Sequence, residues 1–172
     1  MLDYQDGQLA DASKNKIREE LAGFVRLHRP HVVLTFDPSG MTEHPDHVAI
    51  ANFTMDAVVA AADRRMACKE LRPYRVQRLL WTSLVKPWDV TRSPSLSNEA
   101  GVDFMIDVTQ YKEKKIEALQ AHRTQNISID RCFFSKVDVD RILSIEVFRQ
   151  AWGPRLRRVP VDNVLIDIDL SW

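Results

Sequence analysis

Residues 31–65 read HVVLTFDPSGMTEHPDHVAIANFTMDAVVAAADRR and contain a predicted strand, a loop and a predicted helix in immediate succession. The first six residues form a short β-branched run between Pro30 and the turn sequence DPSG, which predicts a buried strand over 31–36. From Asp46 or His47 onward the segment is apolar on more than one face, which predicts a buried helix. The two elements meet at a loop rich in polar side chains.

The segment ahead of this corner also predicts a helix. Residues 11–30 read DASKNKIREELAGFVRLHRP, with Asp11 or Ser13 as a cap and Pro30 just past the end. The apolar residues recur at close to i, i+4, i+7 and i+8, at Ile17, Leu21, Phe24, Val25 and Leu27. A helix followed closely by a strand indicates a layered α/β fold with a largely parallel sheet.

The rest of the chain adds further predicted elements and a surface loop. These are strands over 75–84 and 103–108, a helix over 109–125 with Thr109 as its cap, a short helix over 146–153 and an edge strand over 161–172. Residues 86–102 are rich in turn formers and predict a surface loop, in which Trp88 and Arg92 are candidates for substrate contacts. A plain solvated loop is the alternative.

Composition excludes several classes of protein. The 172 residues are about one domain's worth and are 45% hydrophobic, so residues 1–172 are expected to form a single domain. Lys plus Arg and Asp plus Glu both number 24, which gives no sign of a nucleic-acid or membrane-surface partner. No apolar run approaches the roughly 18 residues of a membrane span. Cys68 and Cys132 stand in unrelated contexts, which favours a reduced, cytoplasmic protein.

The loop between strand and helix contains the sequence His-Pro-Asp-His, residues 44–47. The strand places this loop at the carboxyl edge of the sheet, where ligands of open α/β sheets tend to bind. Gly40 permits a sharp bend, Pro45 suits the first turn of the helix, and Asp46 is favoured at the helix N-terminus. The sequence therefore predicts two imidazoles and a carboxylate held in one rigid corner.

These residue types support metal chemistry, although the spacing alone is a weak signal. One histidine would bind zinc and the other would stabilise a developing oxyanion, with Asp46 orienting an imidazole. A catalytic zinc generally has three protein ligands, and a pair of histidines supplies fewer. The alternative is that a capping aspartate and two polar histidines simply complete the start of a helix.

A wider comparison of motifs points to a family. The stretch RPHVVLTFDPSGMTEHPDHVAIA resembles the second signature of the PIG-L/LmbE-like N-deacetylases, which are zinc enzymes on a Rossmann-like α/β fold. LDYQDGQL is similar to the family's loop ahead of the preceding helix, KKIEALQAHRTQ to one of its later helices, and EVFRQAW to its C-terminal Glu-x-Phe. These matches occur in order over roughly residues 2–152 and are far more specific than the histidine pair.

The resemblance implies roles for individual residues. His47 would be a zinc ligand, and His44 would polarise the tetrahedral intermediate or protonate the leaving group. Asp46 would support a histidine. His122 and Gln125 would lie near the pocket, with packing on a helix surface as the alternative for both. Iron or another divalent ion would tolerate the same ligands as zinc.

The family's first signature, Ala-His-Pro-Asp-Asp-Glu, does not occur in the chain, which has no second His-Pro-Asp. In the family this signature supplies a histidine and an aspartate to zinc and the aspartate that acts as general base. His28 ends a predicted helix and His31 begins a strand, so both are expected to be structural. We therefore expect a partial LmbE-like domain that lacks its first strand and helix, is inactive in isolation, and leaves a hydrophobic sheet edge open.

The functional prediction is the C-terminal portion of a zinc-dependent hydrolase. It would remove an acetyl group from an N-acetylglucosamine-type or related N-acetylated small molecule, and a homo-oligomer is possible. One alternative is a non-catalytic domain that binds a small molecule or a partner and has lost the first signature. A further alternative is an amidase of the same family that cleaves a thiol conjugate.

Overall fold

The computed structural model describes residues 2–66, 71–82 and 102–171, and the chain divides into two compact units. The first unit comprises Met1–Thr82, Gln150–Arg155 and Leu165–Trp172, and the second comprises Ser83–Arg149 and Leu156–Val164. Residues 86–101 of the predicted loop over 86–102, including Trp88 and Arg92, lie outside the described residues. Within the described ranges, every helix is too short or too polar to cross a membrane.

Helix α1 (Lys14–His28) of the first unit confirms the first predicted helix. The Ser13 hydroxyl accepts the N–H of Lys16, and at the other end Arg29 takes a left-handed conformation with φ of 49° while its N–H bonds to the Val25 carbonyl. The buried face consists of Ile17, Ala22 and Arg26. Phe24 and Leu27 of the predicted apolar stripe are instead exposed.

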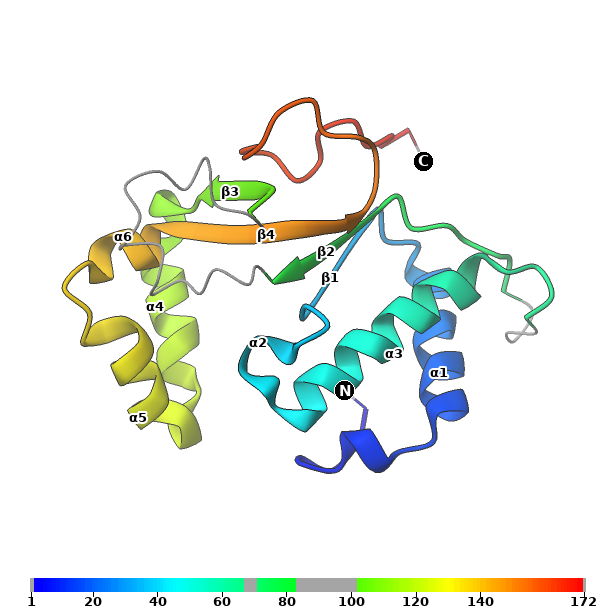
Figure 1. Ribbon diagram of the computed structural model, residues 1–172, viewed down its shortest axis with the longest axis horizontal. Coiled ribbons are helices and arrows are strands. Elements are labelled where there is room, and N and C mark those ends of the chain that lie inside the picture. Colours follow the sequence, from blue (N-terminus) through cyan, green and yellow to red (C-terminus); the bar gives the residue numbers. More distant parts are fainter. Residues whose placement is uncertain (1, 67–70, 83–101, 172) are drawn as a thin grey trace. The chain divides into compact units, whose positions relative to one another are not determined.

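Helix α3 (Pro45–Ala62) confirms the predicted buried helix and lies side by side with α1 (Figure 1). Its buried positions are mostly small, and Ala57 and Ala61 pack directly against Ala22 of α1. Small side chains at a contact allow two helices to approach closely. Phe53, which is 4% exposed, fills the adjacent cluster with Ile17 and Ala49.

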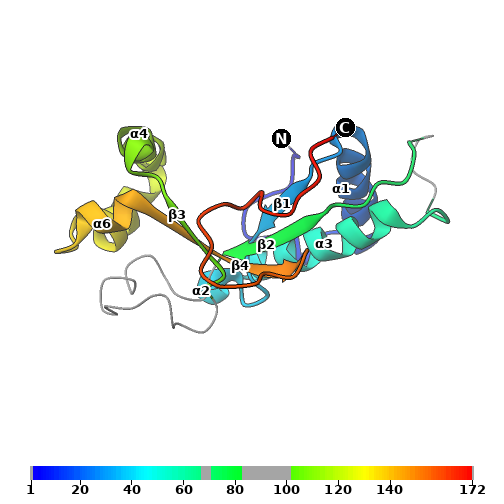
Figure 2. The same ribbon diagram turned by 90° about the horizontal axis from the view of Figure 1, so that it is seen from above.

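Strands β1 (Val32–Thr35) and β2 (Arg78–Thr82) pair in parallel, with Val33 opposite Leu79 (Figure 2). Both strands were predicted, but the first one is not buried as expected. Val33 packs against the cluster of Val58, Tyr74 and Val76, whereas Leu34 is 53% exposed. Alternate side chains of a strand point to opposite faces, so only one face of β1 contributes to the core.

Strands β3 (Phe104–Asp107) and β4 (Ile145–Trp152) pair antiparallel, and the strand order of the sheet is β1-β2-β4-β3. The α/β class is confirmed, and the sheet is mixed where a largely parallel one was expected. The short helix predicted over 146–153 is wrong. Val147 lies opposite Met105 and is buried with Val102. This pairing requires side chains that alternate between the two faces, as in a strand and not in a helix.

The predicted helix over 109–125 is divided into three parts. A 3₁₀ turn η3 (Thr109–Tyr111) precedes α4 (Lys112–Ala121), and a second turn η4 (Arg123–Gln125) follows it. Thr109 is not the cap, because it lies inside the first turn and its N–H donates to Asp107 Oδ1 at 2.8 Å. The second unit continues through α5 (Asn126–Ile129), a π-helical turn η5 (Asp130–Phe134) and α6 (Val139–Ser144).

The C-terminal segment does not form the predicted edge strand. Asp167 takes a left-handed conformation with φ of 58°, which interrupts any extended run through 161–172. The Gln77 side chain donates from Nε2 to the Asp169 carbonyl at 2.7 Å and accepts the Asp169 N–H at 2.8 Å. A side-chain amide thus replaces the backbone partner that a strand would require.

Candidate functional site

The loop between β1 and α3 follows an irregular path that includes the short helix α2 (Gly40–Glu43). Gly40, Met41 and Glu43 all have positive φ, at 70°, 63° and 60°. A side chain on Gly40 would place its Cβ 2.8 Å from the backbone nitrogen of Val48 and 2.9 Å from His47 Cβ. Glycine is therefore required where the loop crosses the first turn of α3.

The ring of His47 is oriented by its surroundings. Its Nδ1 lies 3.1 Å from the Gly40 carbonyl oxygen, and the Phe36 ring stacks on it with centroids 4.1 Å apart and planes inclined by 7°. A carbonyl oxygen accepts only, so Nδ1 carries the proton in this contact. The lone pair of a neutral ring is then at Nε2, which is the usual arrangement of a metal-binding histidine.

His44 has the opposite proton arrangement. It is the N-cap of α3, and its Nδ1 accepts the backbone N–H of Asp46 at 3.2 Å. A neutral imidazole that accepts at Nδ1 carries its proton on Nε2. The two rings lie with centroids 4.9 Å apart. The corner therefore presents one hydrogen-bond donor, from His44, beside one lone pair, on His47.

The carboxylate of Asp46 holds the N-terminal loop. Oδ2 accepts the Gly7 N–H at 2.7 Å, and Oδ1 accepts at 3.0 Å the N–H of Leu9, the first residue of the 3₁₀ turn η1 (Leu9–Asp11). Asp46 contacts His44 through its backbone N–H, whereas its carboxylate bonds to Gly7 and Leu9. The expected support of a histidine by the Asp46 side chain stays a prediction.

Replacing Asp46 with alanine is expected to release residues 5–9 from α3. Both amide hydrogens lose a charged acceptor, so the N–H groups of Gly7 and Leu9 should exchange with solvent faster, and stability should fall by about 1 kcal/mol. Hydrogen exchange followed by NMR measures the first effect. Asp56→Ala, at an exposed position of the same helix, is the control. Unchanged exchange at Gly7 and Leu9 in Asp46→Ala contradicts the anchoring role.

His122 and Gln125 belong to the second unit. His122 is the C-cap residue of α4, and its carbonyl accepts the Gln125 N–H at 2.9 Å within the following turn. Both side chains are exposed. The expectation that they lie near the pocket stays a prediction.

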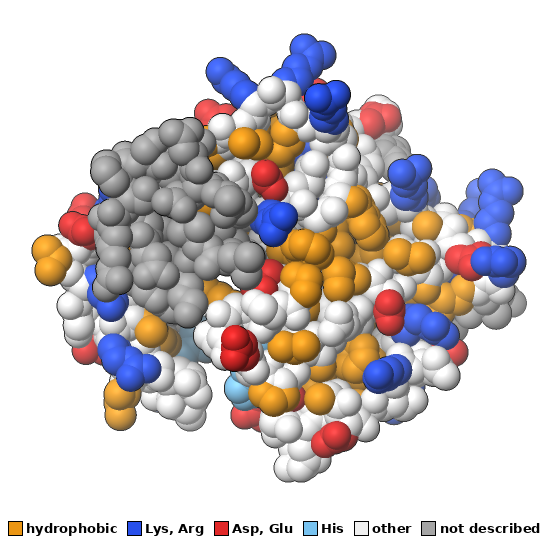
Figure 3. Space-filling model, viewed as in Figure 1, with side chains coloured by type: hydrophobic (Ala, Val, Ile, Leu, Met, Phe, Trp, Pro, Cys, Tyr) orange, Lys and Arg blue, Asp and Glu red, His pale blue; other side chains and the backbone are white. Residues whose placement is uncertain are grey.

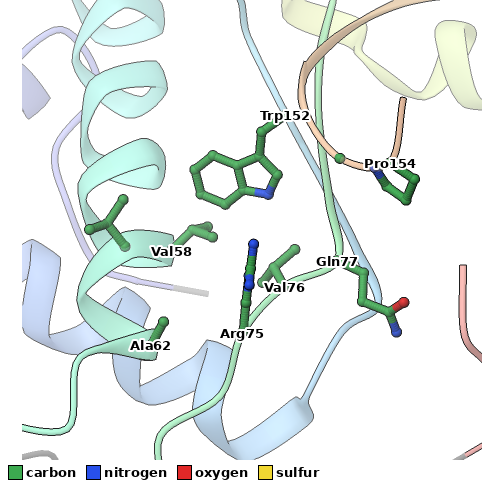
Figure 4. Close-up of a pocket in the computed structure, with 9 residues that line it drawn as sticks. Val58, Ala62, Arg75, Val76, Gln77, Trp152 and Pro154 are labelled. Carbon is green, nitrogen blue, oxygen red and sulfur yellow. The ribbon is translucent and has the colours of Figure 1, made fainter. Parts of the chain in front are cut away.

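The first unit also contains an apolar groove of about 860 Å³ that shares no residue with the histidine corner. Its walls include Val58, Val76 and Trp152, and Arg75 points toward the Trp152 ring (Figure 4). Hydrophobic side chains gather around this part of the surface (Figure 3). No histidine or carboxylate is among the described residues that line the groove, so we place the candidate chemistry at the corner. Among residues 2–66, 71–82 and 102–171, no three His, Cys, Asp or Glu side chains cluster closely enough to hold a metal.

A family model matches the N-terminal part of the chain, which includes the corner. The family described as PIG-L, GlcNAc-PI de-N-acetylase, matches residues 1–58, which include the whole loop from Phe36 to His47. The chain is similar to the PIG-L family over this part of its length. The match ends within α3, so the N-terminal loop, α1, β1 and the corner carry the family's sequence pattern.

Two curated relatives share the name 1D-myo-inositol 2-acetamido-2-deoxy-alpha-D-glucopyranoside deacetylase. The protein from Thermobifida fusca is 33% identical over 82% of this chain and 55% of its own length. The protein from Rhodococcus jostii is 32% identical over 67% of this chain and 45% of its own. The chain thus spans about half the length of the curated relatives it matches.

A solved structure shares the fold. The conserved protein TT1542 from Thermus thermophilus superimposes with a TM-score of 0.63 at 23% sequence identity, covering 96% of this chain and 68% of that protein. The similarity supports the layered α/β architecture of the chain.

The structure adds residues to the site that the sequence analysis did not single out. Phe36 stacks on His47, the Gly40 carbonyl accepts from it, and the buried carboxylate of Asp37 lies in the same loop. The DPSG turn was the available signal, because an aspartate at the start of a turn commonly accepts the N–H two residues on. From the sequence alone, that stretch predicted only where the strand ends.

Proposed function

We propose that the chain forms part of a metal-dependent N-deacetylase acting on an N-acetylglucosamine-type substrate. The opposite proton arrangements of His44 and His47 are the observation that carries the proposal. The names of the curated relatives support the substrate class. In the reaction, water adds to the acetyl carbonyl carbon, the C–N bond breaks, and acetate and a free amine leave.

His47 would hold the metal through Nε2. Its ring is already fixed by Phe36 and the Gly40 carbonyl, so little orientational entropy is lost on binding. Zinc, or another divalent ion that accepts imidazole, would supply Lewis acidity and lower the pKa of a bound water when present. A catalytic zinc generally has three protein ligands, of which His47 would be one. We therefore propose that the chain alone binds zinc weakly and turns over substrate slowly or not at all.

His44 would act on the substrate. Its Nε2–H is the donor that stabilises negative charge developing on the carbonyl oxygen, or that delivers a proton to the departing amine. The bond from the Asp46 N–H to its Nδ1 keeps this proton on the outer nitrogen. Either role needs a donor beside the metal ligand, which the 4.9 Å separation of the two rings provides.

The test is titration of the ¹⁵N-labelled chain with zinc chloride, observed at the imidazole nitrogens. We expect the His47 signals to shift and His47→Gln to abolish the response, whereas His44→Gln retains zinc affinity within about twofold. His28→Gln, on the exposed end of α1, is the control. A zinc response that survives in His47→Gln contradicts the proposed ligand.

Acetate release from an N-acetylglucosamine glycoside separates the remaining alternatives. Zinc-dependent release that is lost in both His44→Gln and His47→Gln supports the deacetylase. Fast release by the chain alone contradicts the proposed dependence on further ligands. Zinc and glycoside binding with no release, even when the full ligand set is present in a longer protein, favours a non-catalytic binding domain.

A further inference from the structure

A buried carboxylate lies next to the histidine corner and is not used by the proposed reaction. Asp37 is 2% exposed and lies two residues after Thr35, the last residue of β1. Burying an ionised carboxylate is costly unless several hydrogen bonds compensate for the lost hydration. Its contacts therefore indicate what the side chain holds in place.

The carboxylate connects the end of β2 to the loop. Oδ1 accepts the backbone N–H of Ser39 at 2.8 Å and also the Ser39 hydroxyl, and Oδ2 accepts the Thr82 hydroxyl at 3.4 Å. The same hydroxyl accepts the Asp37 N–H at 3.1 Å. Asp37 is thus bonded both to the strand beside it and to the residue before Gly40.

These bonds fix the peptide groups that contact His47. The Gly40 N–H donates to the Asp37 carbonyl at 2.8 Å, and the Gly40 carbonyl oxygen lies 3.1 Å from His47 Nδ1. Gly40 is buried and has no room for a side chain, so its carbonyl direction depends on the turn that precedes it. An unbroken set of hydrogen bonds runs from Thr82 through Asp37 and Gly40 to His47.

We propose that Asp37 is a positioning residue, which fixes the His47 tautomer by holding the turn that aims the Gly40 carbonyl. With Nδ1–H committed to that carbonyl, the Nε2 lone pair is available. The consequence for zinc rests on the proposed role of His47 as a metal ligand, whereas the tautomer itself does not.

Asp107 provides a matched control, because its carboxylate also accepts the backbone N–H two residues on. Asp107 is the last residue of β3, and its Oδ1 accepts the N–H of Thr109, two residues on, at 2.8 Å. It belongs to the second unit, whereas the corner belongs to the first. Asp107→Asn therefore reproduces the chemical change of Asp37→Asn without touching His47.

The experiment measures the ¹⁵N signals of the His47 ring in the metal-free chain, which distinguish a protonated nitrogen from an unprotonated one. In the unsubstituted chain and in Asp107→Asn we expect the proton on Nδ1. In Asp37→Asn we expect a mixture of tautomers and about tenfold weaker zinc binding, the size of effect seen when outer partners of metal ligands are changed. Thr82→Val, which removes only the hydroxyl, should shift the tautomer in the same direction by less, and it provides the test if Asp37→Asn does not fold.

The outcomes are distinguishable. A folded Asp37→Asn or Thr82→Val chain that keeps the Nδ1–H tautomer of His47 overturns the positioning role. A shifted tautomer, in a chain whose zinc binding is indifferent to His47→Gln, overturns the proposed metal ligand and leaves the positioning role intact.

Discussion

Replacing Arg26 with methionine is expected to lower the free energy of unfolding by about 3 kcal/mol, among the largest effects of any single substitution in the first unit. Arg26 lies on α1 and is only 4% exposed, although it is a charged residue. Its methylene groups pack like those of methionine, so the substitution isolates the guanidinium.

The guanidinium closes the C-terminal end of α3. Nε donates to the Ala61 carbonyl at 3.0 Å and Nη2 to the carbonyls of Asp63 and Ala60 at 2.7 and 3.3 Å. Nη1 donates to the carbonyls of Met66 and Leu71 at 3.0 and 3.3 Å. Carbonyls at a helix end have no partner within the helix, and a cation there is also favoured by the helix dipole.

Thermal unfolding followed by circular dichroism measures the loss, which should lower Tm by roughly 6–12 °C in a chain of this size. Arg64→Met, at an exposed position in the same turn after α3, is the control and should change Tm by little. A decrease in Arg26→Met no larger than in Arg64→Met contradicts the capping role.

Arg26 also shows where hydrophobic patterning stops being informative. The spacing of Ile17, Leu21 and Phe24 predicted α1 and its limits correctly, because a 3.6-residue repeat is a local property. The buried face nevertheless includes Arg26 and excludes Phe24. Arg26 is buried because the carbonyls of residues 60, 61, 63, 66 and 71 bind its guanidinium. Tertiary structure brings these carbonyls to α1, and a local sequence pattern does not contain that information.

The same distinction holds for β4 and for the corner. EVFRQAW contains residues that suit a helix, and its pairing within the sheet makes it a strand. The sequence predicted His44, Asp46 and His47 as neighbouring candidate site residues because they are almost adjacent in the chain at the start of one helix. Phe36, Asp37 and the Gly40 carbonyl were missed because their roles depend on three positive φ values that bend the loop back onto α3.

Replacing Gly40 with alanine is expected to cost about 2–4 kcal/mol and to disorder the His47 ring. A left-handed conformation costs alanine about 1–2 kcal/mol by itself. The added Cβ would also lie 2.8 Å from the Val48 backbone nitrogen, and a helix backbone cannot give way as a flexible side chain can. Urea denaturation measures the stability, and the ¹⁵N signals of the His47 ring report its hydrogen bond.

Gly7→Ala separates the two contributions, because Gly7 has a φ of 78° and nothing lies within 4 Å of the position that its Cβ would take. It should lose only the conformational part, about 1 kcal/mol, and leave the His47 signals unchanged. Equal losses in Gly7→Ala and Gly40→Ala would mean that the loop yields to the added methyl group. In that case the close approach of Gly40 to α3 does not hold His47, and the imidazole must be oriented by its other contacts, the Phe36 ring and the Thr42 hydroxyl.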